Sequence, residues 1–339
     1  SISYIVLFLD CSLRRSQSGN RHAERRTTDI IQTYLMAEFN INILGCGSAL
    51  PTTRHLATSQ IVDLRDKLYM IDCGEGTQVQ MRRMRVRFGR LAHIFISHLH
   101  GDHCFGLPGL ISTLGMLGRT GELVVHGPKE VETYLRPVMD LFCRGMEFEV
   151  RFNPVDTRSH SLVMEDRSLS VYSIPLKHRI PTCGYLFAEK PKEAHIIREM
   201  TDFYQVPVRC MKDIKQGQDY VTPEGEVVPN SRLTRPAAPP KRYAFCSDTA
   251  YNRSIIPIIE GADLLYHEAT FAECDLARAK ETFHSTARQA AEIARDAHVK
   301  RLVIGHYSAR YEDLSELHRE AEAVFPGTIL GNEGTVIPV

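Results

Sequence analysis

The stretch ISHLHGDHCFGLPG, residues 96–109, places three histidines and an aspartate within six positions. An apolar run, HIFIS, comes directly before the cluster, and a glycine-rich turn follows it. His98 and His100 are two residues apart, so in an extended loop their rings point to the same side and can share one metal ion. Asp102 and His103 then point elsewhere and can bind a second ion. The stretch therefore predicts a dinuclear centre with ions about 3.5–4 Å apart.

The donor atoms of this cluster indicate which metal to expect. Nitrogen and carboxylate ligands without thiolate suit zinc first, with manganese or iron as alternatives, since Cys104 fits poorly in an otherwise N/O set. Gly101 allows the tight turn between the two pairs of side chains. The alternative is a histidine cluster that binds no metal, but such crowding of ligand-type side chains is not typical of a core.

Length and composition describe an ordinary globular chain. The 339 residues are 43% hydrophobic and 24% charged, which suits one large or two medium domains. Lys+Arg and Asp+Glu number 41 each, so the formal net charge is zero. Any site for a polyanion must therefore be a local cluster of positive residues. Nine cysteines argue against a disulfide framework and for a reducing, cytoplasmic location. Apolar runs fall short of the roughly 20 residues of a membrane helix, so we expect no membrane association.

Two segments differ from the rest of the chain. Residues 1–35 become polar and arginine-rich before Met36 opens MAEFNINILGCGSALPT, so we expect an N-terminal extension that is disordered or not native, followed by a domain over residues 36–339. A docked N-terminal element is the alternative. Residues 189–241 are rich in Lys, Glu, Gln, Gly and Pro, and we interpret them as an arm inserted into that domain.

Strand-like and helix-like runs alternate from Phe39 onward. The predicted strands are FNINILGCG, KLYMIDCG, HIFISH, ELVVHGP, SLSVYSIPLKH, RYAFCSDT, DLLYHEAT and RLVIGHYS, and the clearest helices are PKEVETYLRPVMDLFC and STARQAAEIARDAH. Polar residues stand at or just beyond the ends of these strands: His98, His178, Asp248, His267, Glu268 and His306. In layered α/β folds that rim is where sites assemble from distant sequence.

The HxHxDH string resembles the signature of the metallo-β-lactamase superfamily. Further motifs narrow the resemblance to the ribonuclease Z family, and it runs from Phe39 to the C-terminus: GSALPTTRH (47–55), IDCGEGTQVQM (71–81), LKHRIPTCGY (176–185), FCSDTAYN (245–252), HEATF (267–271), HSTARQAA (284–291) and IGHYSARY (304–311). The resemblance implies an α/β fold of four layers, αββα, with two facing sheets flanked by helices and a flexible arm. It also implies a zinc-dependent endoribonuclease that removes the 3′ trailer from tRNA precursors, leaving a 3′-hydroxyl on the tRNA and a 5′-phosphate on the trailer.

The family pattern also implies roles for individual residues. One zinc ion would be bound by His98, His100 and His178, the other by Asp102, His103 and His306, with Asp248 bridging the two. Asp72 would orient a ligand histidine. His284 would protonate the leaving oxygen. The N-terminus of a helix that Ser285 caps would lower the pKa of His284, and Glu268 would offset this effect and keep His284 protonated. Asp102 would handle the proton of the attacking water.

Contacts with RNA are expected from basic residues. The run QMRRMRVRFGR supplies Arg82, Arg83, Arg85, Arg87 and Arg90, although a solvated helix face would look the same. Arg54 follows the PTT turn, and Lys212 and Lys215 lie in the arm, which lacks the family's usual glycine-proline pair. The resemblance further implies a homodimer. Two other readings remain: another hydrolase of the superfamily, such as a small phosphodiesterase, lactonase or glyoxalase II, and a non-catalytic RNA-binding module.

Overall fold

Two seven-stranded sheets form the centre of the fold in the computed structural model, which describes residues 38–339. The prediction for residues 1–35 lies outside the described residues. The first sheet has the order β18 (Val336–Pro338), β1 (Phe39–Gly45), β2 (Ser59–Leu64), β3 (Lys67–Ile71), β4 (Leu91–Phe95), β5 (Leu123–Gly127), β6 (Val150–Pro154). The second has the order β17 (Ile329–Leu330), β16 (Leu302–Gly305), β15 (Leu264–Glu268), β14 (Arg242–Cys246), β9 (Cys183–Glu189), β8 (Leu169–Pro175), β7 (Leu162–Glu165).

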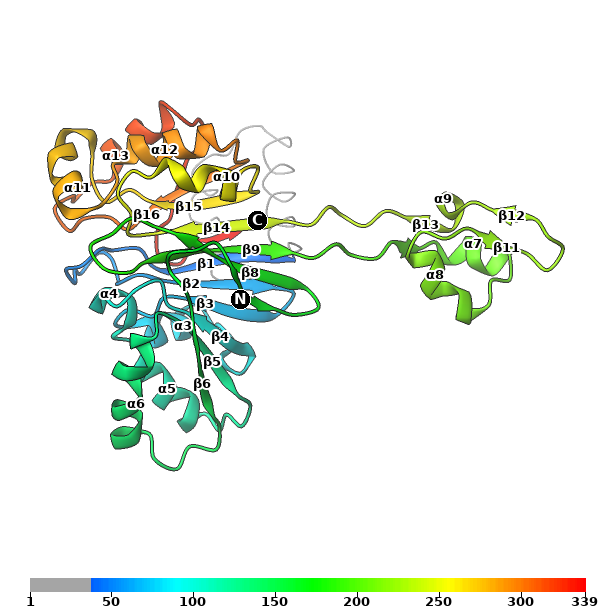
Figure 1. Cartoon of the computed structure of the whole chain (residues 1–339), viewed down its shortest axis with the longest axis horizontal. Helices are drawn as coiled ribbons and strands as arrows, with labels where there is room; N and C mark the ends of the chain where they lie inside the picture. Colours follow the sequence, from blue (N-terminus) through cyan, green and yellow to red (C-terminus); the bar gives the residue numbers. More distant parts are fainter. Residues whose placement is uncertain (1–37) are drawn as a thin grey trace, which may run out of the picture. The chain divides into compact units, whose positions relative to one another are not determined.

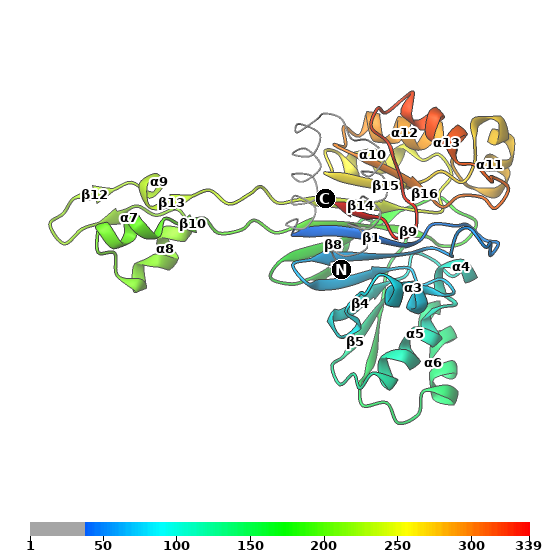
Figure 2. The same cartoon turned by 180° about the vertical axis from the view of Figure 1, so that it is seen from behind.

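Side chains of the central strands of the first sheet alternate between two separate hydrophobic cores, one on each face of the sheet. On β4, Phe95 packs between the sheets, whereas Ile94 and Ile96 beside it pack against helices on the outer face. On β1, Ile43 packs between the sheets and Leu44 packs against the outer helices. A sheet that is apolar on both faces must be covered on both, which gives the layers helix, sheet, sheet and helix. Figures 1 and 2 show these layers from opposite sides and confirm the predicted αββα fold.

Helices cover the outer face of each sheet. The first sheet carries α3 (Thr77–Arg83), η1 (Phe88–Arg90), α4 (Gly101–Cys104), α5 (Leu107–Met116) and α6 (Glu130–Phe142). The second carries η3 (Arg253–Ile255), α10 (Ile256–Ile259), η4 (Glu273–Asp275), α11 (Leu276–Thr282), α12 (Ala287–Asp296) and α13 (Ser315–Glu322).

The start of α12 differs from the prediction by one residue. Thr286, and not Ser285, is the N-cap, because its hydroxyl accepts from the Gln289 backbone while the Gln289 side chain bonds back to the Thr286 backbone. The Ser285 hydroxyl instead donates to the backbone oxygen of Thr249 at 2.7 Å. The prediction was wrong because either hydroxyl suits a cap, and only the glutamine three residues later distinguishes them.

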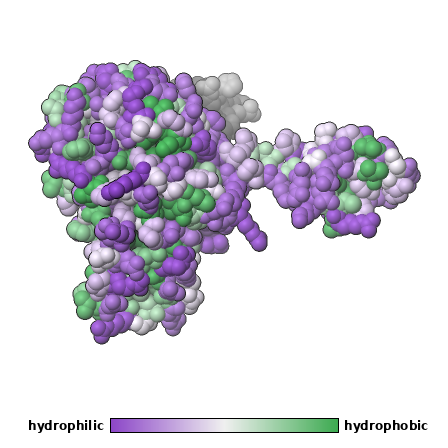
Figure 3. All heavy atoms as spheres, in the orientation of Figure 1, coloured by the Kyte–Doolittle hydropathy of each residue, from purple (hydrophilic) through white to green (hydrophobic). Residues whose placement is uncertain are grey.

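A small unit lies between β9 and β14, at residues 190–241. It contains β10 (His195–Ile196), α7 (Arg198–Phe203), η2 (Val208–Cys210), α8 (Met211–Lys215), β11 (Tyr220–Val221), β12 (Val227–Val228), α9 (Asn230–Leu233) and β13 (Thr234–Arg235). Its two-stranded sheets are separate from the large ones, and it has its own core around Ile214, Val228 and Leu233. In the view of Figure 3 its surface is largely hydrophilic. We call this unit the arm.

The arm is fixed at its base by a buried carboxylate. Glu189, 7% exposed, forms ion pairs with Arg65 at 3.1 Å and with Lys192 at 3.2 Å. Its other oxygen accepts from the backbone of Lys241 at 3.1 Å. The two ends of the arm are therefore joined to the second sheet and to each other where β9 ends and β14 begins.

Candidate metal centre

Most polar residues of the site follow the ends of parallel strands, whereas His178 follows β8, which is antiparallel to both of its neighbours. Strands β3 and β4 run parallel, as do β14, β15 and β16, so their C-terminal ends meet at the same edges of the sheets. At three of these ends the backbone is left-handed, with φ of 55° at Asp72, 61° at Asp248 and 60° at His306. Residues other than glycine rarely adopt such angles, and where they do the surrounding structure enforces them, often at functional sites.

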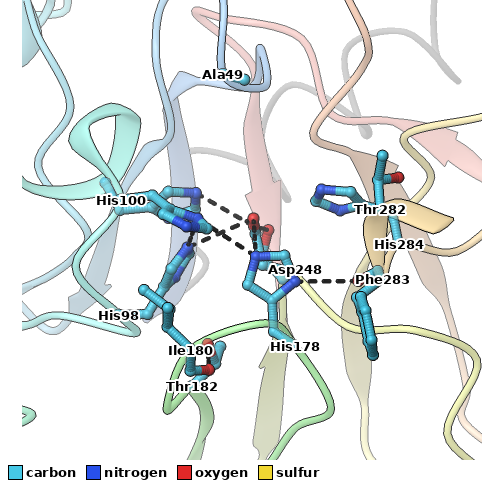
Figure 4. Close-up of polar contacts among 12 residues, drawn as sticks. Ala49, His98, His100, His178, Ile180, Thr182, Asp248, Thr282, Phe283 and His284 are labelled. Atoms are coloured by element: carbon cyan, nitrogen blue, oxygen red, sulfur yellow. Dashed lines mark hydrogen bonds and ion pairs between the residues drawn. The ribbon is translucent and has the colours of Figure 1, made fainter.

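Three histidines and one aspartate form the first group of candidate ligands (Figure 4). The Nε2 atoms of His98 and His178 lie 2.9 Å and 3.3 Å from His100 Nδ1. Both Nε2 atoms also face Asp248 Oδ2, at 3.5 Å and 3.7 Å. Burial lowers the pKa of all three histidines, so the neutral form that binds metal ions is favoured.

The second group consists of Asp102, His103 and His306. Asp102 Oδ2 lies 3.4 Å from His103 Nε2 and 3.6 Å from His306 Nε2. The same two nitrogens face Asp248 Oδ1, at 3.2 Å and 3.1 Å. Each oxygen of Asp248 thus faces a different group, which is the geometry of a carboxylate that bridges two ions.

These residues fit a pair of metal ions. His103 Nε2 and His306 Nε2 are buried and make no hydrogen bond, although the Asp102 and Asp248 carboxylates lie near them. This is a costly arrangement for imidazole nitrogens unless something else binds them. For ligands about 2.0–2.2 Å from a tetrahedral ion, the distance between ligand atoms is about 3.3–3.6 Å. Most of the separations above are close to this range. The ligand assignment itself remains a prediction.

A further layer of contacts orients the candidate ligands through their other ring nitrogens. His103 Nδ1 lies 2.7 Å from Asp72 Oδ2, and His98 Nδ1 lies 3.0 Å from the Ser97 hydroxyl. The Ser97 hydroxyl in turn donates to Asp72 at 2.9 Å. His178 Nδ1 donates to the backbone oxygen of Phe283 at 3.1 Å, as Figure 4 shows. Such contacts fix the orientation of each ring and determine which of its nitrogens is available to bind a metal ion.

Glu268 connects this layer to His284. One carboxylate oxygen lies 2.9 Å from His284 Nδ1, and the other accepts from the Thr270 hydroxyl, which lies 3.0 Å from His306 Nδ1. Burial disfavours the imidazolium of His284, but the Glu268 carboxylate outweighs this effect and raises the pKa of His284 to about 9. As Nδ1 is held by Glu268, Nε2 is the nitrogen that remains available for a proton transfer.

A cleft of about 830 Å³ opens over the two groups. Its lining residues come from the loop 47–57, from Glu75 and Gly76, from residues 100–105, from residues near His178 and His284, and from Asp248 and His306. Phe105, 57% exposed, and the cation Arg179 are among them. The cleft therefore combines candidate metal ligands with an aromatic ring and a positive charge, which suits a nucleic-acid strand.

The residues predicted to contact RNA do not line the cleft. The exposed run Arg82, Arg83, Arg85, Arg87 and Arg90 does not contribute to the lining of the cleft. Arg87 pairs with Asp66 at 3.3 Å, and the last three arginines border a separate depression. Arg54 donates to the backbone oxygen of Ala309 beside the cleft. Lys212 and Lys215 are exposed on α8 in the arm. Their part in binding RNA remains a prediction.

Sequence reasoning missed several residues of the site. Thr270 stands in the HEATF motif and Arg179 follows His178 directly, so both had a signal in the quoted motifs. Ser97 likewise stands in the stretch 96–109, directly before His98. The role of the Phe283 carbonyl depends on the tertiary structure and had no such signal. His267 is buried and its Nδ1 lies 2.8 Å from the Glu268 backbone oxygen, away from the ligand groups, as its position on β15 predicts.

Within residues 38–339, each helix is too short or too polar to cross a bilayer.

A family model described as "Anti-Pycsar protein Apyc1" matches residues 39–129. The chain is 81% identical over 304 residues to Ribonuclease Z of Parabacteroides distasonis, covering 90% of this chain and 100% of that protein. It is 63% identical to Ribonuclease Z of Bacteroides fragilis, covering 89% and 99%. Human tRNase Z, short form, is 25% identical with a TM-score of 0.64, covering 88% of this chain and 100% of that one.

Proposed function

The chain belongs to the ribonuclease Z family of tRNA 3′-processing endonucleases, and from this premise we propose that it cleaves tRNA precursors with two zinc ions held by the groups described above. His98, His100 and His178 would hold one ion, and Asp102, His103 and His306 the other. Asp248 would bridge them. Nitrogen and carboxylate donors without thiolate favour zinc among the metals available to such a site.

The arrangement of Asp248 supports this proposal most directly. Its two oxygens face two different sets of imidazoles at 3.1–3.7 Å, from a backbone held in the left-handed region. A mononuclear site would need only one of these sets. When bound, the ions would lower the pKa of a water molecule to supply hydroxide and would neutralise the charge of the scissile phosphate.

His284 would act on the leaving group. Cleavage that leaves a 3′-hydroxyl on the tRNA expels a ribose 3′-oxygen, which needs a proton. His284 lines the cleft and is kept protonated by Glu268, so its free Nε2 can donate that proton. The last nucleotide of the mature tRNA would then lie on the His284 side. Asp102, which accepts from the Ala49 backbone at 2.8 Å, would take up the proton of the attacking water.

The arm would bind the tRNA away from the cleft. Among the described residues, the lining of the cleft includes none from residues 190–241, so arm contacts and chemistry occupy different surfaces. We propose a homodimer in which the arm of one subunit presents tRNA to the cleft of the other, as the family resemblance implies. We also propose a cytoplasmic location, which the free cysteines favour. Light scattering on the purified protein tests the dimer.

One assay tests the reaction. The protein is incubated with a precursor tRNA that carries a labelled 3′ trailer, and both new ends are mapped. We expect cleavage at the start of the trailer, with a 3′-hydroxyl on the tRNA and a 5′-phosphate on the trailer. A 5′-hydroxyl on the trailer, or hydrolysis of small phosphodiesters without cleavage of the precursor, would contradict the proposal.

A further inference from the structure

A second cluster of ligand-type side chains lies outside the catalytic groups. Cys46, His55 and Glu333 come from three separate parts of the chain, and one candidate ligand atom from each lies within 4.8 Å of the others. Cys46 is fully buried, and the side chains of His55 and Glu333 are 18% and 14% exposed. None of the three takes part in the proposed reaction.

The distances between these atoms match a single-ion site. His55 Nδ1 lies 3.4 Å from Cys46 Sγ and 3.0 Å from Glu333 Oε2. A tetrahedral zinc ion with bonds of about 2.3 Å to sulfur and about 2.1 Å to nitrogen and oxygen sets these two separations at about 3.6 Å and about 3.4 Å. These two separations would have to change by only a few tenths of an ångström, and the ligand atoms of Cys46 and Glu333 lie within 4.8 Å of each other.

The carboxylate is also oriented as metal-binding carboxylates are. Glu333 Oε1 accepts from the backbone of Leu56 at 2.7 Å and of Cys46 at 3.3 Å, which leaves Oε2 directed at His55. Backbone bonds of this kind fix a ligand without using its free oxygen. Burial opposes ionisation of Glu333, but its hydrogen bonds lower the pKa, so the carboxylate is charged.

The cluster lies in the wall of the catalytic cleft. His55 and Leu56 line the cleft together with the loop that precedes them, and Ala49 of that loop donates to Asp102. An ion held by Cys46 and Glu333 would therefore fix the position of a loop that contacts a catalytic carboxylate.

We propose that Cys46, His55 and Glu333 form a third, single-ion site for a thiophilic divalent cation of the zinc type, distinct from the catalytic pair. A thiolate, an imidazole and a carboxylate leave one coordination position open for water. Binding replaces the thiol proton of Cys46, since the thiolate is the form that coordinates.

Cobalt(II) absorption tests this site, because a thiolate ligand gives a near-ultraviolet charge-transfer band that the N/O ligands of the catalytic groups cannot give. The full-length protein is stripped with a chelator and titrated with cobalt(II). The parent should develop the band. Cys46→Ser should lose it and bind about one cobalt ion fewer per chain.

Cys104→Ser is the matched control, since this buried thiol lies next to the catalytic loop and donates to the backbone of His100 at 3.2 Å. It should keep the band. A second variant, His55→Asn, keeps the thiol and should weaken cobalt binding at this site at least about tenfold. The proposal is overturned if the saturated parent shows no band, if Cys46→Ser retains it, or if only Cys104→Ser removes it. None of these results bears on RNA cleavage.

Discussion

Replacing His284 by alanine separates protonation of the leaving group from metal binding. The side chain is not among the seven proposed ligands, and its removal leaves Glu268 with three other donors: the Thr249 backbone at 2.7 Å, the Thr270 hydroxyl at 2.5 Å and the Ser285 backbone at 3.1 Å. The buried carboxylate therefore stays satisfied, and the metal content should not change. Loss of a general acid lowers the rate by about 10²–10⁴, or about 3–5 kcal/mol in the barrier.

The assay for His284→Ala compares two substrates under single-turnover conditions. Cleavage of precursor tRNA should show the full loss, whereas a nitrophenyl phosphodiester, whose leaving group needs little protonation, should be affected much less. In the parent, precursor cleavage should decline as pH rises through about 9, where His284 loses its proton, and the variant should lack this decline. Equal losses on both substrates would refute the general-acid role, and loss of bound metal would show that His284 is a ligand.

Three further predictions concern the metal bridge, the arm and the core. Asp248→Ala should lose both ions together by elemental analysis, and two tightly held ions in this variant would refute the bridge. Replacing residues 196–229 by a Gly/Ser linker should lower kcat/KM for precursor tRNA while hydrolysis of a small phosphodiester stays nearly unchanged; equal precursor cleavage would refute the arm's role. Burial and the neighbouring His93 lower the pKa of His126 to about 3 in the folded protein, against about 6.5 in the unfolded chain. Below pH 6.5 the unfolded chain therefore takes up a proton that the folded protein does not. The resulting loss of stability grows as the pH falls from about 6.5 towards 3. Between pH 7 and pH 5 the chelator-treated parent should lose about 2 kcal/mol more than His126→Asn in urea unfolding, and parallel losses would refute this assignment.

The sequence predicted eight of the fourteen strands in the two large sheets, because alternation of apolar residues and polar residues at strand ends are local signals. The αββα layers were predicted from the family resemblance of the motifs. The local signals did not single out β2 and β9, whose runs SQIVDL and CGYLFAE contain small or polar residues at positions that are nevertheless buried. Burial of Gln60 on β2 depends on the hydroxyl of Tyr243 from the other sheet, a contact that no local pattern reveals.

The candidate ligands were predictable for a similar reason. HxHxDH, LKHRIPTCGY, FCSDTAYN and IGHYSARY are contiguous motifs that contain all seven proposed ligands, so their residue types are visible in the chain. The family resemblance then implies which ion each residue would bind. The cluster of Cys46, His55 and Glu333 was not visible, because Glu333 is separated from His55 by 278 positions and no motif surrounds it. The arginine run after residue 81 was predicted to contact RNA, but α3 and η1 place it outside the lining of the cleft, beside a separate depression.

Restoration of activity to the metal-free protein shows directly whether cleavage depends on a pair of ions bridged by Asp248. The chelator-stripped parent and Asp248→Ala are each supplied with zinc, and cleavage of labelled precursor tRNA is followed alongside elemental analysis of bound metal. We expect no cleavage before zinc is added, recovery in the parent as both ions bind, and no recovery in Asp248→Ala. Undiminished cleavage by protein shown to be free of metal would contradict this dependence.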